Sequence, residues 1–491
     1  MFQLPEVTKD KVLKVPHFPT DFQTLVFRMW EMVDSAKIAE VIGTSKENVV
    51  KLAADMGLPK QEHLSEWKTR GYISILRAVW NLLPYEQILE LLECSAERLA
   101  FILKEDDFLG IKLGEKCDCK LVKYRELTDS EAARTREIKA SMEKYVLPLY
   151  KDGYAAPFDF YSTKPEGFGA KNAGGVTVDS SWGLTYPENE LLSKMAEDFM
   201  RFAGEYGIVF SEKAEKCITV SLDADTDDEE YHEVHIKADG IRIVAATPFG
   251  ALRGFYELEK LAEAAGGFCF EEKVMKRKTK MKTRFIYSFS GLYTDVLECD
   301  TRISFPDELL ERYGRCGING VWIQGVLYTL APYPFDETKC DGWQTRLERL
   351  RDLSERALRY GIKVYIYINE PRAMPESFFA TRPDLKGAVS RGDSYTLCSS
   401  HPEVQKYLYD AIHTICEYDP NLGGFLAITQ SENLTTCYSK SAKPTECPVC
   451  AKRTPTEVTA EVLNAMADAV NDVDPKIKFF AYAWVWDRAF K

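Results

Sequence analysis

The sequence lacks any segment that would carry the chain into or through a membrane. No apolar run approaches the roughly 20 residues that a membrane-spanning helix needs. The first residues, MFQLPEVTKDKVLK, contain neither the apolar stretch nor the cleavage site of a secretory signal. The 13 cysteines are scattered and odd in number, which favours reduced thiols over a disulfide framework. We therefore expect a cytoplasmic protein that does not bind membranes.

Positive charge is also scarce relative to negative charge. The chain has 63 Lys and Arg residues against 76 Asp and Glu residues, which gives a net charge of −13. A surface of this sign repels polyanions, so nucleic acid is a poor partner. The composition favours no particular oligomeric state. The 491 residues are expected to form about three domains, at roughly 100–200 residues each.

Residues 1–125 are predicted to form a helical domain that contains a repeat. Segments 36–59 and 86–109 align without a gap, and in each copy a serine, Ser45 or Ser95, is expected to cap a second helix. The pattern predicts two helix-turn-helix-like repeats. Apolar residues recur at helical spacing in Phe22–Val33, Ile38–Leu52, Ile73–Leu83 and Ile88–Leu103.

The first copy admits two interpretations, a DNA-binding arm or a pair of packed helical hairpins. Its candidate recognition helix, SKENVVKLAADMG, contains no arginine, which is the usual reader of guanine. We favour packed hairpins for this reason. A charged connecting helix is expected next, within residues 126–153.

Residues 154–278 are predicted to form a small α/β domain. An amphipathic helix is expected at Leu191–Tyr206, and Thr247 is expected to cap a second helix whose first turn holds Pro248. The Asp239-Gly240 pair is typical of a hairpin turn. The strands are expected at Cys217–Leu222, Glu233–Lys237 and Ile241–Ala246.

Residues 282–491 alternate short apolar strands with amphipathic helices, which is typical of a parallel sheet. A (β/α)8-type barrel fits this pattern, with a doubly wound open sheet as the alternative. Only five strands can be recognised, and a closed barrel needs about 250 residues, so we expect a barrel truncated after strand five. The strands are expected at Phe285–Phe289, Gly320–Gln324, Lys363–Ile368, Gly424–Thr429 and Lys478–Trp486.

Polar and aromatic side chains follow these strands at the point where each strand ends. In a parallel barrel this edge carries the active site. Carboxyl groups and aromatic rings suit a sugar, and glycoside hydrolysis needs a carboxylic proton donor. Glu432 is the candidate catalytic acid. The candidate substrate-binding residues are Gln324, Asn369, Glu370, Asn433, Trp484, Trp486 and Asp487, and Glu370 or Asp487 is a candidate second carboxylate.

The loop after Glu432 contains three cysteines, Cys437, Cys447 and Cys450. Cys398 lies at the end of an extended segment and supplies a candidate fourth ligand. Four thiolates can hold a structural zinc ion, and free thiols are the alternative. We expect no cofactor to be needed for catalysis.

Two stretches resemble family 20 glycoside hydrolases, the β-N-acetylhexosaminidases. The first, DGIRIVAATPFGALRGFYELEKL at 239–261, resembles the small α/β domain that precedes the barrel in that family, with its G-x-R-I-x-A-T-x-x-G-A-L-x-G pattern. This domain is a structural companion without catalytic residues. The resemblance implies that a catalytic barrel follows.

The second stretch, GGFLAITQSENLTTC, is similar to the end of the family's fourth barrel strand. That strand ends in Gly-Gly-Asp-Glu, where Glu is the general acid and Asp orients the substrate acetamido group. The resemblance places Glu432 on the acid and Ser431 on the Asp, so the acid is implied without the acetamido-assisted mechanism. Glu432 with CPVC also resembles related barrel hydrolases of sugar-utilising bacteria.

Two classes of function remain open at this point. The first is a hexosaminidase-like glycosidase that acts on a carbohydrate substrate through Glu432. Because later barrel strands are expected to be missing, this chain could be active or inactive. The second is a carbohydrate-sensing or carbohydrate-binding protein without turnover, with a DNA-binding helix-turn-helix arm. Loss of hydrolysis on replacing Glu432 would separate them.

Overall fold

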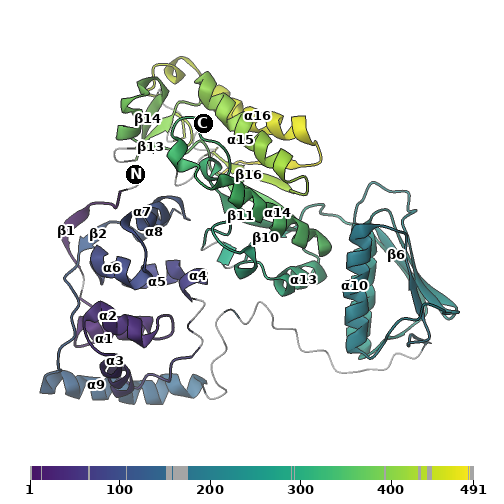
Figure 1. Ribbon diagram of the computed structural model, residues 1–491, viewed down its shortest axis with the longest axis horizontal. Coiled ribbons are helices and arrows are strands. Elements are labelled where there is room, and N and C mark those ends of the chain that lie inside the picture. Colours follow the sequence, from purple (N-terminus) through teal and green to yellow (C-terminus); the bar gives the residue numbers. More distant parts are fainter. Residues whose placement is uncertain are drawn as a thin grey trace.

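The protein folds into three regions that follow one another along the chain (Figure 1). A helical region is followed by a small α/β region and then by a C-terminal region built on a parallel sheet. Among the described residues, no helix combines the length and apolarity that crossing a bilayer requires. The computed structural model describes residues 3–484 and 486, apart from 13, 63, 65, 66, 107, 151–157, 159–174, 289, 292, 293, 392, 393, 430–432 and 440–444.

The helical region contains two copies of a three-helix unit, in which the predicted two-helix repeat follows a helix that the apolar spacing also predicted. The serine caps are confirmed, because Ser45 Oγ accepts from Asn48 N and Ser95 Oγ accepts from Arg98 N. The first copy comprises α1 (Asp21–Met29), α2 (Ser35–Ile42) and α3 (Lys46–Asp55), and the second α5 (Tyr72–Val79), α6 (Tyr85–Leu92) and α7 (Ala96–Glu105).

Shorter elements complete this region. A parallel pair joins β1 (Val7–Lys11) to β2 (Lys116–Asp118), which the helical periodicity did not predict. The connecting helix is α9 (Asp129–Ser141), which begins with a capping box and packs against α3. The remaining elements are α4 (Trp67–Arg70), α8 (Leu109–Leu113), a π turn at Met142–Val146 and a 3₁₀ turn at Leu147–Tyr150.

The small α/β region is a five-stranded sheet in the order β4-β5-β7-β6-β9, with α10 and α11 packed together. The cap on α11 is confirmed, since Thr247 Oγ1 accepts from Gly250 N. The predicted strands and helices are present, but β4 and β9 were missed because one is short and the other, KVMKR, is mostly charged. The bounds are β4 Gly183–Thr185, β5 Cys217–Ser221, β6 His232–Lys237, β7 Gly240–Ala245, β9 Lys273–Arg277, α10 Glu190–Glu205 and α11 Pro248–Ala265, with a β3–β8 pair at Val176–Thr177 and Cys269–Phe270.

The C-terminal region is built on five parallel strands in the order β10-β11-β12-β16-β17, as predicted. Helices alternate with the strands, and the predicted helices are present. The strands are β10 Phe285–Ile286, β11 Gly320–Gly325, β12 Lys363–Ile368, β16 Gly424–Ile428 and β17 Lys478–Tyr482. The helices are α13 Asp307–Arg315, α14 Trp343–Arg359, α15 Pro402–Tyr418 and α16 Pro455–Val473, and 3₁₀ turns cover Thr301–Ile303, Leu327–Thr329, Glu337–Lys339 and Cys450–Lys452.

A buried carboxylate joins the small α/β region to the beginning of this sheet. Glu230 accepts hydrogen bonds from Arg253 Nε (2.7 Å), Arg284 Nη2 (2.6 Å) and Asn319 Nδ2 (3.2 Å). Arg253 belongs to α11, whereas Arg284 and Asn319 directly precede β10 and β11. Glu230 therefore clamps the small region to the N-terminal edge of the parallel sheet, where its strands begin.

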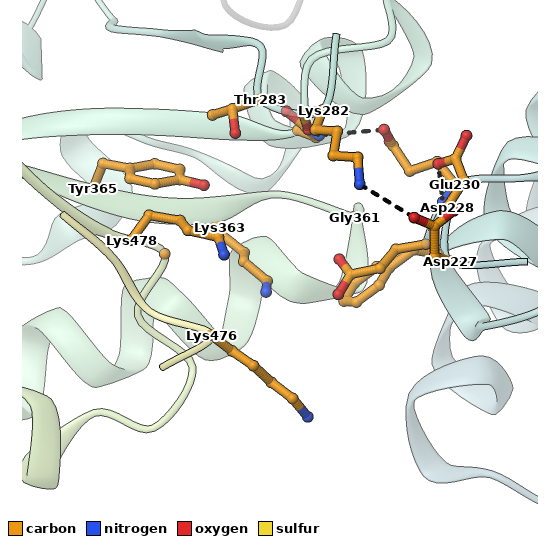
Figure 2. A pocket seen from close by; sticks show the side chains of 14 residues that line it. Asp227, Asp228, Glu230, Lys282, Thr283, Gly361, Lys363, Tyr365, Lys476 and Lys478 are labelled. Carbon is orange, nitrogen blue, oxygen red and sulfur yellow. Dashed lines mark hydrogen bonds and ion pairs between the residues drawn. The ribbon is translucent and has the colours of Figure 1, made fainter. Parts of the chain in front are cut away.

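A pocket of about 210 Å³ opens beside this clamp (Figure 2). Lys363, Lys476 and Lys478 line it from the beginnings of β12 and β17. Asp227 faces them from the small region and lies 3.7 Å from Lys282 Nζ. The sequence did not predict this pocket, because its lining comes from two regions far apart along the chain.

The parallel sheet is strongly curved. The rings of Phe285 in β10 and Phe480 in β17 lie 6.1 Å apart, although these strands form the two edges of the sheet among the described residues. In a flat sheet the two strands would be about 19 Å apart, four strand spacings. The sheet is therefore a half-barrel, with Phe285, Tyr365 and Phe480 in contact on its concave face.

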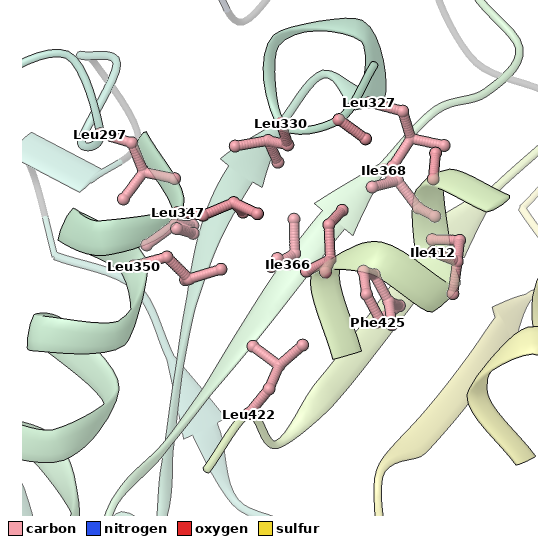
Figure 3. Packing of buried hydrophobic residues seen from close by; sticks show 14 of the residues in the cluster. Leu297, Leu327, Leu330, Leu347, Leu350, Ile366, Ile368, Ile412, Leu422 and Phe425 are labelled. Atoms are coloured by element: carbon pink, nitrogen blue, oxygen red, sulfur yellow. The ribbon is translucent and has the colours of Figure 1, made fainter. Parts of the chain in front are cut away.

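Helices α13 to α16 pack on the convex face, which forms the main hydrophobic core (Figure 3). Alternate strand residues such as Ile366 and Phe425 are fully buried there against Leu350 of α14 and Ile412 of α15. A doubly wound sheet would carry helices on both faces. Among the described residues the helices of this region lie on one face of a curved sheet, which favours the barrel-type architecture over the open alternative.

An antiparallel sheet lies between β12 and α15 in the chain and was not predicted. Its order is β13-β15-β14, and β15 ends one residue before Cys398. The three strands are short, and one contains a proline, so no run of alternating residues marked them. The strands are β13 Met374–Pro375, β14 Lys386–Arg391 and β15 Ser394–Leu397, with 3₁₀ turns at Glu376–Ala380 and Pro383–Leu385.

Candidate functional site

The candidate site lies at the C-terminal edge of the half-barrel, where the strands end. Parallel pairing brings the ends of β11, β12 and β16 side by side, because Gly325 pairs with Ile368 and Ile368 pairs with Ala427. The chain leaves β16 through Thr429, which is buried, and is described again from Asn433 onward. Glu432 and Ser431, which separate these two anchors, lie outside the described residues.

Hydrogen bonds hold the loop after β16 against the end of that strand. Thr429 O accepts from Thr435 Oγ1 at 2.7 Å and from Ser439 Oγ at 2.8 Å. The indole Nε1 of Trp486, which follows β17, donates to Thr429 Oγ1 at 3.1 Å. The predicted residue Trp486 is therefore adjacent to the strand end that precedes Glu432.

Two other predicted residues, Asn369 and Asn433, meet at this edge. Asn369 is fully buried and its Nδ2 donates to Ile428 O at 2.6 Å. Asn433 Nδ2 donates to Asn369 O at 3.3 Å, and Asn433 Oδ1 accepts from Ala373 N at 3.4 Å. The two amides tie the end of β12 to the loop after β16.

Glu370 is buried beneath the loops, only 2% exposed. Its Oε1 accepts from Leu327 N and its Oε2 from Arg372 N, each at 2.9 Å. Burial raises the pKa of Glu370 to about 7, a value suited to a proton donor. Both oxygens are nevertheless engaged by backbone N–H groups, so in this structure Glu370 joins the loops after β11 and β12.

A carboxylate from the helical region shares this cluster. Glu105, the last residue of α7, is 2% exposed, and Tyr328 Oη donates to its Oε1 at 2.6 Å. Arg372 Nε lies 3.4 Å from Glu105 Oε2 and 3.7 Å from Glu370 Oε1. Burial opposes ionisation of Glu105, but Arg372 and Lys104 outweigh it and lower its pKa. The positive charge of Arg372 is thus shared between two buried carboxyl groups.

Helix α7 packs the helical region onto this edge of the sheet. Lys104 Nζ donates to Ala373 O at 3.0 Å, and Arg98 forms an ion pair with Glu298. The sequence interpretation missed Glu105 and its partners. A signal was present, because Glu105 lies three residues after buried Ile102 and so shares the apolar face of the helix.

Aromatic rings line the concave face of the half-barrel. The Trp322 ring lies 5.0 Å from that of Tyr287 and 5.7 Å from that of Tyr367. Tyr482 and Trp484 stack 5.9 Å apart, with an angle of 20° between their rings. Tyr482 is 46% exposed and Trp484 is 53% exposed. The face therefore offers accessible ring surfaces close to the ends of the strands.

The remaining predicted residues divide between this face and the undescribed part of the chain. Gln324 lies two residues after Trp322 in β11 and is half-buried on the same side of the strand. Val321 and Ile323 alternate with them and are buried in the convex core. Asp487, like Glu432, lies outside the described residues.

The four predicted cysteines come together. The sulfur atoms of Cys398, Cys437, Cys447 and Cys450 all lie within 4.8 Å of one another, and all four residues are buried. No disulfide joins any of the 13 cysteines, all of which lie among the described residues. The lysine-lined pocket of Figure 2 is at the opposite edge of the sheet, away from the strand ends and from this cluster.

Comparisons with known proteins give structural neighbours only. No protein-family model and no curated protein matches the sequence. The chitobiase of Flavobacterium johnsoniae is 16% identical with a TM-score of 0.43, over 61% of this chain and 49% of the chitobiase. The β-N-acetylhexosaminidase of Bacteroides fragilis is 13% identical with a TM-score of 0.41, over 61% of this chain and 62% of the enzyme.

A third neighbour belongs to a different hydrolase family. A GH138 enzyme that targets the pectin rhamnogalacturonan II is 15% identical with a TM-score of 0.41, over 59% of this chain and 34% of that enzyme. The chain spans about half the length of the chitobiase and about a third of the GH138 enzyme.

Proposed function

We propose that this protein is a glycoside hydrolase in which Glu432 protonates the leaving glycosidic oxygen. One observation carries the proposal. The curved parallel sheet carries exposed aromatic rings on its concave face. These rings lie next to the C-terminal end of β16, the strand that precedes Glu432 in the chain. Rings of this kind can stack on the apolar face of a sugar, while neighbouring amides and carboxyls bond its hydroxyl groups.

The flanking residues support the role of Glu432 as the acid. Thr429 and Asn433, the described residues on either side of it, are both held by hydrogen bonds at the ends of β12 and β16. A general acid must be within reach of the leaving oxygen in the bound complex. Gln324 and Asn433 are proposed to contact sugar hydroxyls, and Trp484 and Trp486 to stack on or flank the ring. Asn369 is fully buried, so we propose that it holds the strand end and Asn433 in place.

The second carboxylate of the proposed mechanism is better assigned to Asp487 than to Glu370. Glu370 accepts two backbone hydrogen bonds and is buried, so we propose that it positions the loops that carry the sugar contacts. Asp487 directly follows Trp486, whose indole bonds Thr429. Because Ser431 stands where an acetamido-orienting Asp would be needed, we do not assign an acetamido-assisted reaction.

The test is hydrolysis of aryl and alkyl glycosides by the full chain and by Glu432→Gln. Loss of a general acid is expected to lower the rate by roughly 10²–10⁴-fold. The loss should be small for a 4-nitrophenyl glycoside and large for an alkyl glycoside, because a good leaving group needs little protonation. Glu446→Gln, an exposed glutamate of the same loop, is the matched control and should retain full activity.

Carbohydrate binding without turnover is the second candidate function, because the exposed rings of Tyr482 and Trp484 could bind a sugar whether or not Glu432 acts as an acid. In that case sugars would quench tryptophan fluorescence without being cleaved. Trp484→Ala would abolish the quenching, and Glu432→Gln would leave it unchanged. Equal hydrolysis of all substrates by Glu432→Gln and the unmodified chain would instead contradict the proposed role of Glu432.

A further inference from the structure

Four cysteines from three separate segments meet in one buried cluster. Cys398 directly follows β15, Cys437 lies in the loop after β16, and Cys447 and Cys450 precede α16. Cys398 Sγ lies 3.6 Å from Cys447 Sγ and 3.7 Å from Cys450 Sγ, and all four sulfur atoms are within 4.8 Å of one another.

These distances exclude a disulfide and are compatible with four sulfurs arranged around one metal ion. A disulfide would bring two sulfurs to about 2.05 Å. Four sulfurs placed tetrahedrally around a zinc ion, each at about 2.3 Å from it, are about 3.8 Å from one another. The observed 3.6 and 3.7 Å match the edge of that tetrahedron. We propose that Cys398, Cys437, Cys447 and Cys450 bind one zinc ion as a closed tetrathiolate site.

The surroundings of the cluster suit the charge of such a site. Zinc with four thiolates carries two net negative charges. Ser400 Oγ lies 3.3 Å from Cys450 Sγ and accepts a hydrogen bond from Arg453 Nη1 at 2.7 Å. Glu461, which is paired with Arg453, lies 3.5 Å from the same hydroxyl through its Oε2. The shorter contact allows Ser400 to donate to the sulfur while the guanidinium polarises the hydroxyl. Outer hydrogen bonds of this kind orient metal ligands and stabilise their charge.

Space around Cys437 is preserved by a glycine. A Cβ at Gly387 in β14 would lie 2.8 Å from Cys437 Sγ and 2.3 Å from Thr396 Oγ1. Thr396 Oγ1 itself lies 3.6 Å from Cys437 Sγ. The small sheet β13-β15-β14 therefore forms one wall of the site, and a side chain at Gly387 would displace the sulfur.

Metal binding would fasten the loop after β16 at its far end. Thr429 anchors this loop at the strand end, and Cys437 would anchor it to β15 and to the start of α16. Tyr438 reinforces the same attachment, because its Oη donates to Cys450 O at 3.0 Å and to Arg453 O at 2.9 Å. With all four ligands supplied by protein sulfur, the ion has no open position for substrate. Its role is therefore to brace the loop.

Binding is a ligand exchange without a redox change. The zinc ion sheds water molecules, and the four thiols release their protons to solvent as four Zn–S bonds form. The affinity should therefore fall as pH falls, because protons compete with the metal for the sulfurs. The inference is independent of the proposed glycosidase activity.

The first measurement is the metal content of the full chain, purified without chelator and loaded with zinc chloride followed by desalting. About one zinc ion per chain is expected. Cys437→Ser should lower the content to well below half an equivalent. The matched control is Cys416→Ser, which removes a buried thiol of α15 outside the cluster and should keep one zinc.

A second measurement on the unmodified chain covers the case in which Cys437→Ser fails to fold. Replacing zinc by cobalt should give the intense thiolate charge-transfer bands and strong visible bands of a tetrahedral tetrathiolate site. Amide exchange at residues 433–439 should slow when zinc is restored to the chelated chain. Either four alkylatable cluster thiols in zinc-loaded protein or a mass lower by about four hydrogens, from two disulfides, would overturn the proposal. Preferential retention of iron over zinc would overturn the identity of the metal.

Discussion

Both edges of the parallel sheet carry many charged side chains, but the two sets differ in how far solvent reaches them. At the C-terminal edge, Glu105, Glu370 and Arg372 are buried together, each less than 5% exposed. At the N-terminal edge, Lys363 and Lys478 face a pocket of about 210 Å³. Solvent can screen the charges of the open edge, whereas the buried charges must be balanced by one another. The buried charges at the edge with the candidate site therefore depend on specific partners, whereas the lysines of the pocket do not.

The largest expected effect is the loss of the buried arginine. Arg372→Met should destabilise the C-terminal region by about 3–5 kcal/mol, because it leaves two buried carboxylates without their shared cation. Urea unfolding followed by tryptophan fluorescence measures this cost. Arg351→Met, which removes an exposed arginine paired with Glu355, is the control and should change the midpoint little. Equal midpoints for the two variants would abolish the distinction between the edges.

The next effect is a pH dependence that Glu370 contributes. Burial raises its pKa to about 7 from an ordinary value of 4.5. Between pH 4.5 and 7, the folded chain retains a proton that the unfolded chain has released, so stability falls as pH rises and levels off above pH 7. At about 1.4 kcal/mol per unit, the total is about 3 kcal/mol.

Glu370→Gln isolates that contribution, because the amide does not titrate. The stability of the unmodified chain minus that of Glu370→Gln should decline through this pH window. Thermal unfolding from pH 4.5 to 8 measures the difference. A constant difference would mean that Glu370 ionises in the folded protein as readily as in the unfolded one.

An intermediate effect is expected where the N-terminal edge has a buried charge of its own. Glu230→Gln should cost about 2 kcal/mol, because the guanidinium groups of Arg253 and Arg284 lose their anionic acceptor and its compensating charge. Proteolysis should then cut more readily between the small α/β region and the sheet. Glu229→Gln, at the exposed neighbouring residue, provides the comparison. If Glu230→Gln changed neither the stability nor the rate of cleavage, the hydrogen bonds of Glu230 would not be needed to hold the two regions together.

The smallest effect is expected in the pocket itself. Lys478→Ala should change stability by no more than about 0.5 kcal/mol, because the lysine is exposed and its loss also relieves repulsion from Lys363. Thermal unfolding measures the change in stability, and a comparison of low and high salt measures the repulsion between the two lysines. A marked loss of stability would show that the exposed lysines of the N-terminal edge contribute as much to stability as the buried charges of the C-terminal edge.

Much of the fold followed from local patterns. The Ser45, Ser95 and Thr247 caps, the β6–β7 hairpin and the five parallel strands were all predicted from the sequence, since each depends on residues close together in the chain. The turn of the hairpin consists of Ala238 and Asp239, one position before the predicted Asp239-Gly240 pair, because Gly240 already pairs with Lys237 in the sheet. The antiparallel sheet at β13 to β15 was missed because its short strands carry no clear alternation.

The candidate site divides in the same way. Residues at strand ends, such as Asn369 and Asn433, could be named because parallel pairing aligns the ends of neighbouring strands. Glu105 and Arg372 could not, because their pairing joins residues 267 positions apart through the packing of α7 on the loops.

The sequence by itself determined the elements, their order and the set of chemically capable side chains, because propensity, capping and periodicity act over a few residues. Only the tertiary structure decided that the sheet curves until Phe285 touches Phe480, that Glu370 is buried, and that four cysteines share one centre. These outcomes depend on which distant surfaces exclude water together, and neighbouring residues along the chain carry little information about that.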